Sequence, residues 1–174
     1  PKKAVDYGIA YVPEDRKQHG ALLTLPIDWN ITLPILKRIS KGGFINTAEE
    51  NTVVETQRKN LLIKAATMSQ YVNSLSGGNQ QKVVLGKWLA SKPKLLILDE
   101  PTRGVDVNAK QEIYQLIGKL AKQGIAIILI SSEMEELLEI SDRMMVLNEK
   151  RIAGFLEKEE FTQNIVLAMA SGLA

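Results

Sequence analysis

The sequence predicts an α/β fold built on parallel strands, and three features of the second half of the chain support this prediction. Two short apolar runs, 95–98 and 125–130, have the length and composition of buried strands. A segment of helical periodicity, 108–122, separates them and ends before Gly124. Because parallel strands need a crossover connection, this order favours a βαβ unit with strands covered on both faces.

The composition is that of one globular domain. The 174 residues are 45% hydrophobic and 24% charged, which argues against a disordered or fibrous chain. With no cysteine, disulfides, thiolate zinc sites and cysteine nucleophiles are excluded, and one histidine argues against a multi-histidine metal site. The net charge is only +2 and the basic pairs are scattered, so we expect no nucleic-acid partner. No apolar run approaches the roughly 20 residues that span a bilayer.

The first half of the chain is mostly helical. A β-prone segment, 6–12, ends at a proline and is followed by a polar loop over 14–20. Helices broken by loops come next, over 30–39 and 48–64. The spacing from Thr47 to a glutamate three residues later is that of a capping box, which predicts where the second of these helices starts.

The remaining elements flank the βαβ unit. A helix that opens at Ser76 and runs to Ala90 precedes it. A short helix over 133–140 and a hairpin of strands over 143–147 and 151–156 follow it, and Thr162 is placed to cap a final helix.

Two carboxylates, Asp99 and Glu100, follow the first predicted parallel strand directly. Ligands bind at the carboxyl ends of such strands. Asp99 could hold Mg²⁺ and Glu100 could polarise a water that attacks a phosphoryl group. Taken alone, the pair fits better a strand that simply reaches solvent.

A second candidate site lies where the helix after Leu75 begins. Gly77 and Gly78 allow backbone N–H groups to approach an anion, and the positive end of the helix points to the same place. Ser76 can add a hydroxyl donor or cap the helix. An ordinary helix cap would be the simpler interpretation of this tripeptide if it stood alone.

Taken in order, these segments resemble motifs of the ATP-binding cassette (ABC) ATPases. The resemblance implies a P-loop NTPase-like parallel sheet core with an inserted helical subdomain. Finer matches resemble the C-terminal cassette of double-cassette ATPases that power bacterial importers of ribose, galactose and xylose. The matching segments are 75–82 (signature sequence), 95–102 (Walker B strand), 103–106 (D-loop), 127–133 with 141–143 (switch strand and following helix), and, for the finer match, 12–17, 42–46 and 79–83.

The resemblance implies a site shared between two cassettes. Ser76, Gly77 and Gly78, with Gln80 beside them, would contact the γ-phosphate of ATP held by a partner cassette. Asp106 in the D-loop would link the two sites across the interface. The signature sequence is intact, so we expect this chain to act mainly in trans.

The resemblance also assigns this chain's own half of a nucleotide site. Asp99 would support Mg²⁺ and Glu100 would be the catalytic carboxylate. Glu14 occupies the Q-loop position, where the family usually has glutamine, and Ser132 occupies the switch position, where it has histidine. A carboxylate has no amide donor and serine cannot replace imidazole, so we expect slow or no hydrolysis at this site.

No Gly-x-x-x-x-Gly-Lys-Ser/Thr loop occurs in the 174 residues. In the family this Walker A loop lies upstream of the Q-loop, so we expect an N-terminally truncated cassette without ATPase activity of its own. Residues 1–174 would then be a partial ABC ATPase domain. Within it, 26–90 would form the helical signature subdomain, and 91–174 with 1–20 the rest of the catalytic core.

The expected parent protein energises sugar import from the cytoplasmic face of the bacterial membrane, to which it binds peripherally. Its partners would be a second cassette, transmembrane permease subunits and, indirectly, a periplasmic or extracellular sugar-binding protein, with ATP and Mg²⁺ as cofactors. Ile27, Trp29, Ile31 and Phe44 could form the permease groove, or pack in the core. The alternatives are an ABC ATPase outside transport, as in DNA repair or on ribosomes, and a nucleotide-independent interaction module.

Overall fold

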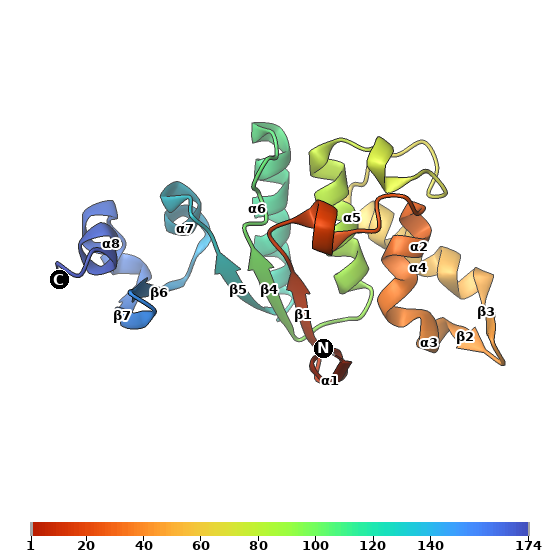
Figure 1. The fold of residues 1–174 in the computed structure, drawn as a ribbon, viewed down its shortest axis with the longest axis horizontal. Helices are drawn as coiled ribbons and strands as arrows, with labels where there is room; N and C mark the ends of the chain where they lie inside the picture. The colour runs from red at the N-terminus through yellow and green to blue at the C-terminus, as the bar shows by residue number, and fades with distance from the viewer. Residues whose placement is uncertain (1, 174) are drawn as a thin grey trace. The chain divides into compact units, whose positions relative to one another are not determined.

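The computed structural model describes residues 2–173 and shows two compact units (Figure 1). The first unit extends to Ile130 and the second begins at Ser131. Across residues 2–173, every helix is too short or too polar to cross a membrane.

A three-stranded parallel sheet forms the centre of the first unit. Its order is β1 (Ile9–Val12), β4 (Leu95–Asp99) and β5 (Ala126–Ile130), with β4 in the middle. The crossover from β4 to β5 is α6 (Val107–Lys122), which lies along the sheet in Figure 1. The predicted α/β fold with a parallel βαβ unit is therefore confirmed.

The two faces of this sheet differ in burial. Ala10, Val12, Leu96 and Leu98 are at most 1% exposed, because their face packs against helices of the first unit. On the opposite face, Tyr11 is 45% exposed, and Ile128 and Ile130 are 48% exposed. The prediction that both faces are covered was wrong, because a continuous apolar run does not show whether an element lies over each face.

The first strand is shorter than expected. Asp6, which was predicted to begin this strand, is instead the last residue of α1 (Lys2–Asp6). Gly8, with a φ of +82°, makes the turn into β1. After β1, η1 (Arg16–Gly20) is a short π-helix, capped by the Asp15 carboxylate, which accepts hydrogen bonds from two backbone N–H groups.

Helices and one small hairpin fill the segment between β1 and β4. The predicted helix over 30–39 is not continuous. Residues 27–39 form three short helical elements, and the second of them contains the proline. The elements are α2 (Ile27–Thr32), η2 (Leu33–Ile35), α3 (Leu36–Ile39), the hairpin of β2 (Ser40–Lys41) and β3 (Phe44–Ile45), α4 (Thr47–Leu61), η3 (Val72–Ser74) and α5 (Gly77–Leu89).

The start of α4 differs by one residue from the prediction. Asn46 is the cap, because its side-chain oxygen accepts a hydrogen bond from the N–H of Glu49 at 3.2 Å. Thr47 is the first helical residue and is not the cap. Asparagine and threonine both cap helices well, so sequence alone could not choose between these neighbours.

The second unit has its own small core. A helix, α7 (Met134–Ile140), precedes an antiparallel hairpin of β6 (Arg143–Asn148) and β7 (Arg151–Glu157), then η4 (Lys158–Glu160) and α8 (Gln163–Ala170). Thr162 caps α8, as predicted, by accepting a hydrogen bond from the N–H of Ile165 at 3.2 Å. The buried centre of this unit consists of Met144, Val146, Leu156 and Val166.

Candidate functional site

The signature loop, residues 76–78, consists of the exposed Ser76 and the first two residues of α5. Ser76 has extended backbone geometry, and its side chain does not cap the helix. Its hydroxyl oxygen accepts a hydrogen bond from Asn79 Nδ2 at 3.0 Å, and Asn79 Oδ1 accepts one from the N–H of Lys64 at 2.8 Å. Asn79 therefore holds the serine hydroxyl in place. Sequence reasoning had not assigned Asn79 a role, although its i+3 spacing from Ser76 was a usable signal.

The two glycines of this loop are required by close packing. A Cβ on Gly78 would lie 2.6 Å from the Cβ of Ala109 in α6. A Cβ on Gly77 would lie 3.0 Å from Arg16 Nη2 and 3.2 Å from the carbonyl oxygen of Gly104. The glycines thus allow the start of α5 to lie against the loop before α6 and against α6 itself.

Arg16 joins two segments that are far apart in sequence. Its Nη1 donates to the carbonyl of Arg103 at 2.7 Å, and its Nη2 donates to the carbonyl of Gly104 at 3.1 Å. An ion pair between Glu14 and Arg103 adds a second link between the same segments. The predicted Q-loop position and the predicted D-loop are therefore bonded directly. Sequence analysis missed Arg16, because an arginine in a polar loop gives no signal of its partner.

Asp106 and Gln80 hold the ends of the helices that border the loop. Asp106 caps α6, with its Oδ1 accepting a hydrogen bond from the N–H of Ala109 at 3.0 Å. Gln80 is 7% exposed and donates from Nε2 to the carbonyl of Leu75 at 3.1 Å. In this structure the buried Gln80 side chain stabilises the conformation of the signature loop through this hydrogen bond.

A concave site of about 250 Å³ lies beside the loop. Below it, the buried Lys82 donates from Nζ to Glu112 at 2.5 Å and to the carbonyl of Leu62 at 3.2 Å. The hydrogen bond from Lys82 lowers the pKa of Glu112. The lining residues are Lys64, Ser76, Gly78, Asn79, Lys82, Asp106, Asn108, Ala109 and Glu112.

The acidic pair stands at the carboxyl end of β4. Tyr11 Oη donates to Asp99 Oδ2 at 2.7 Å, and this hydrogen bond is the main reason that the pKa of Tyr11 is raised. Glu100 has a φ of +47°, and its N–H donates to the carbonyl of Ile130 at 2.9 Å. A left-handed conformation is costly for glutamate, and such strain is concentrated at functional sites.

The predicted site residues therefore form two groups in the first unit. One contains Ser76, Gly77, Gly78 and Asp106, and the other contains Asp99 and Glu100. Ser132 belongs to the second unit, where it is exposed and precedes α7. Among residues 2–173 no three His, Asp or Glu side chains gather as a metal-binding group.

This combination of a parallel sheet, a strand ending in Asp-Glu and a glycine loop at a helix N-terminus defines an ATP-binding cassette. The family model described as ABC transporter matches residues 3–103, which is more than half of the chain. The chain belongs to the ABC transporter family.

Curated relatives match over nearly the whole chain. The ribose import ATP-binding protein RbsA of Geobacillus kaustophilus is 51% identical over 172 residues, which cover 99% of this chain and 35% of the relative. The xylose import ATP-binding protein XylG of the same organism is 50% identical over 172 residues, which cover 99% of this chain and 34% of the relative. The chain thus spans about a third of the length of these relatives.

Solved structures support the fold. The ATP-binding cassette MJ0796, in a dimeric post-hydrolysis state bound to ADP and Pi, aligns with a TM-score of 0.75 at 22% identity, covering 92% of this chain and 66% of that chain. The ATP-binding cassette MJ1267 of an ABC transporter aligns with a TM-score of 0.78 at 20% identity, covering 97% of this chain and 70% of that chain. The predicted P-loop NTPase-like fold is confirmed.

Proposed function

We propose that this chain is part of the ATPase that energises import of a monosaccharide, and that it supplies the signature loop to a partner cassette. The observation that carries the proposal is the N-terminal end of α5, where Ser76, whose hydroxyl is held by Asn79, and Gly78 line a concave site together with Asp106. The intact loop argues against a module that has lost its use for nucleotide. The sequence identity of 51% and 50% to a ribose and a xylose import ATP-binding protein supports a sugar as the transported substrate.

ATP would supply the phosphoryl group whose transfer to water drives transport. The glycine N–H groups and the positive end of α5 would hold its terminal phosphate across the cassette interface. Asp99 would ligate Mg²⁺ in this chain's own half-site, and Glu100 would orient water. Glu14 is occupied by Arg103 and Ser132 carries no imidazole, so we propose that this half-site turns over slowly.

The experiment compares Ser76→Arg with Glu100→Gln in the full-length assembled transporter. If the chain acts in trans, Ser76→Arg reduces ATPase activity at least 100-fold, while Glu100→Gln keeps most of it. Asn73→Arg is the matched control, because Asn73 is exposed three residues before the loop and gains the same charge. The opposite ranking of the two site variants would contradict the proposal.

We propose further that permease subunits dock on the helical segment and hold the protein at the cytoplasmic face of the membrane. Of the four candidate residues, Ile27 and Ile31 are fully buried, whereas Trp29 is 57% and Phe44 is 83% exposed. The first two therefore belong to the core and the last two to the proposed contact. A crosslinker placed at position 29 or 44 should capture a permease subunit. If a crosslinker captures the permease from the exposed Tyr7 (75%) but from neither of these positions, the proposed contact is wrong.

A further inference from the structure

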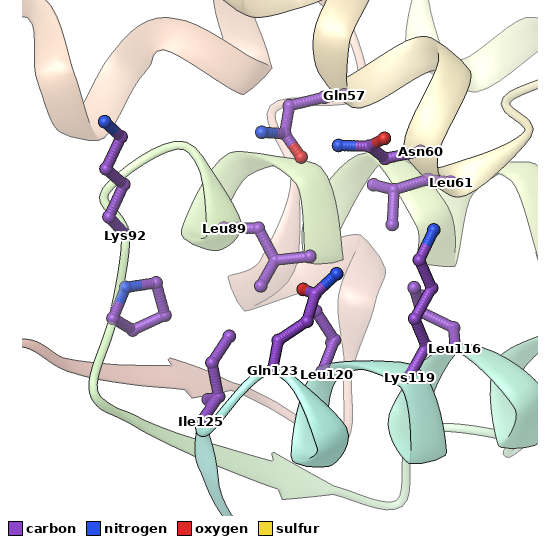
Figure 2. A pocket seen from close by; sticks show the side chains of 11 residues that line it. Gln57, Asn60, Leu61, Leu89, Lys92, Leu116, Lys119, Leu120, Gln123 and Ile125 are labelled. Atoms are coloured by element: carbon purple, nitrogen blue, oxygen red, sulfur yellow. The ribbon is translucent and has the colours of Figure 1, made fainter.

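A cavity at the opposite end of α5 from the signature loop is used by none of the functions above. It lies where α4, α5 and α6 all approach their C-terminal ends (Figure 2). The cavity volume is about 300 Å³, at the lower end of the range for small-molecule sites. At about 1.5 Å per residue, the 13 residues of α5 place about 20 Å between the cavity and the signature loop.

The cavity is lined by both apolar and amide side chains. Leu89, Leu116 and Leu120 form the apolar surface. Figure 2 shows the amide of Gln57 pointing down from α4 and the amide of Gln123 pointing up from the end of α6 toward the same space. A surface of this kind matches a ligand with one apolar face and several hydroxyl groups, because each amide offers both a donor and an acceptor.

Gln57 offers the cavity an amide that no other residue uses. It is only 9% exposed, and within residues 2–173 its side-chain amide makes no hydrogen bond. Its amide atoms are not sealed from solvent, so hydrogen bonds to a ligand would replace hydrogen bonds to water. Its Cβ packs near Gly86 of α5, at 3.6 Å from where a Cβ on that glycine would lie, so the backbone of α4 holds the amide over the cavity.

The charges at the cavity are positive. Lys92 and Lys119 line it, no acidic residue lines it, and neither ammonium group forms an ion pair within the described residues. The helix C-termini each contribute about half a negative charge at most, which the two lysines outweigh. Lys92 also adopts a left-handed φ of +54°, a conformation that is costly for lysine.

We propose that this cavity binds a small organic anion that carries several hydroxyl groups, of the class of the sugar phosphates. The amides of Gln57 and Gln123 bind its hydroxyl groups, the leucines contact its apolar face, and Lys119 binds its phosphate. The site rests on the cavity's own geometry and does not depend on the proposed role of the signature loop.

The test is titration of the purified chain with ribose 5-phosphate as the probe, followed by calorimetry and by NMR of backbone amides. We expect saturable binding, with shifts at the C-terminal ends of α4, α5 and α6. Lys119→Ala and Gln57→Leu should each weaken binding at least tenfold. Lys122→Ala and Gln111→Leu are matched controls, since both residues are exposed on α6 outside the cavity, and they should bind the probe as the unchanged chain does.

Two further titrations separate the parts of the ligand. Ribose and inorganic phosphate should each bind at least tenfold more weakly than ribose 5-phosphate. The proposal is overturned if either binds equally well, if no binding occurs, or if shifts gather at the N-terminus of α5. Equal binding by the Lys119→Ala variant would also overturn it, and because Lys119 is exposed this variant tests the site even if Gln57→Leu does not fold.

Discussion

Gly78 shows how one residue can serve packing and chemistry together. It lies buried at the second position of α5, where its backbone faces Ala109 of α6. A glycine in a signature motif is normally credited to phosphate binding alone. Here a Cβ added to Gly78 would lie only 2.6 Å from the Cβ of Ala109, so the lack of a side chain also permits the spacing of the two helices.

Gly78→Ala is therefore expected to destabilise the chain by about 1–3 kcal/mol, the usual cost of overpacking. Adding Ala109→Gly removes the clashing methyl group and should recover most of that loss. Urea unfolding of the single and double variants measures both effects. If the single variant is as stable as the unchanged chain, the two helices are not in the close contact described.

Arg16 is the second residue with an effect beyond its own loop. It donates to two successive carbonyls, which the planar fork of a guanidinium can do and a lysine ammonium cannot reproduce in the same geometry. We expect Arg16→Lys to release residues 103–106 while leaving the sheet intact.

Hydrogen exchange of the backbone amides measures this prediction. In Arg16→Lys, exchange at Val105, whose N–H bonds the carbonyl of Thr102, should accelerate at least tenfold. Amides of β4 should exchange as before. Lys17→Arg is the control, since Lys17 is exposed and bonds neither carbonyl. Unchanged exchange at Val105 would show that the ion pair of Glu14 with Arg103 holds the loop by itself.

The contrast between these residues shows what sequence could and could not predict. The candidate residues Ser76, Gly77, Gly78 and Asp99 were found because each lies within a short motif with its own spacing. Arg16 was not, because its partners are 87 and 88 residues away and only the folded chain brings them together. Gln57 was not singled out for the same reason. A glutamine in a polar helix is expected to be exposed, and its burial follows only from the packing of α4.

At the scale of elements, α5 and α6 are joined by a charged pair below the signature loop. Lys82 has a side chain only 4% exposed and is bonded to Glu112, whose side chain is 34% exposed. A buried ammonium without a carboxylate is costly. This pair therefore ties the stability of the helix contact to the ionisation of Glu112.

The pH dependence follows from the lowered pKa of Glu112, whose main cause is the hydrogen bond from Lys82. A depressed carboxyl pKa stabilises the fold above the unfolded-state pKa, and this stability is lost as pH falls through the folded-state pKa. Glu112→Gln should lower the free energy of unfolding by about 1–2 kcal/mol at neutral pH and flatten its decline in acid. Urea unfolding midpoints measured between about pH 3 and pH 7 test both expectations. If the variant loses stability in acid as steeply as the unchanged chain, other carboxylates cause that loss.

Element types were predictable and their surroundings were less so. The parallel strands β4 and β5, the hairpin of β6 and β7 and the cap at Thr162 follow from local patterns, and the structure bears them out. The cap of α4 shifted by one residue because two adjacent residues are both good caps. Apolar runs also predicted a sheet covered on both faces, but only packing decides which face is covered.

For the whole molecule, the half-exposed face of the central sheet is the feature with the largest consequence. Tyr11 lies on β1, and Ile128 and Ile130 lie on β5, the two strands that flank β4; on that face each is close to half exposed. Adjacent exposed apolar side chains favour association with another surface. We expect the chain to self-associate as its concentration rises.

Ile128→Lys should reduce this association and leave the fold intact. The substitution places a charge on the open face at the edge strand β5, and an exposed position typically changes stability by no more than about 0.5 kcal/mol. Light scattering over a concentration series should show a lower mean mass for the variant than for the unchanged chain. Ile127→Lys is the control, because alternate residues of a strand point to opposite faces and this charge would enter the covered side. It should unfold the chain or lower its melting temperature sharply. If Ile128→Lys associates as strongly as the unchanged chain, the contact between copies lies elsewhere, and the open sheet face does not drive it.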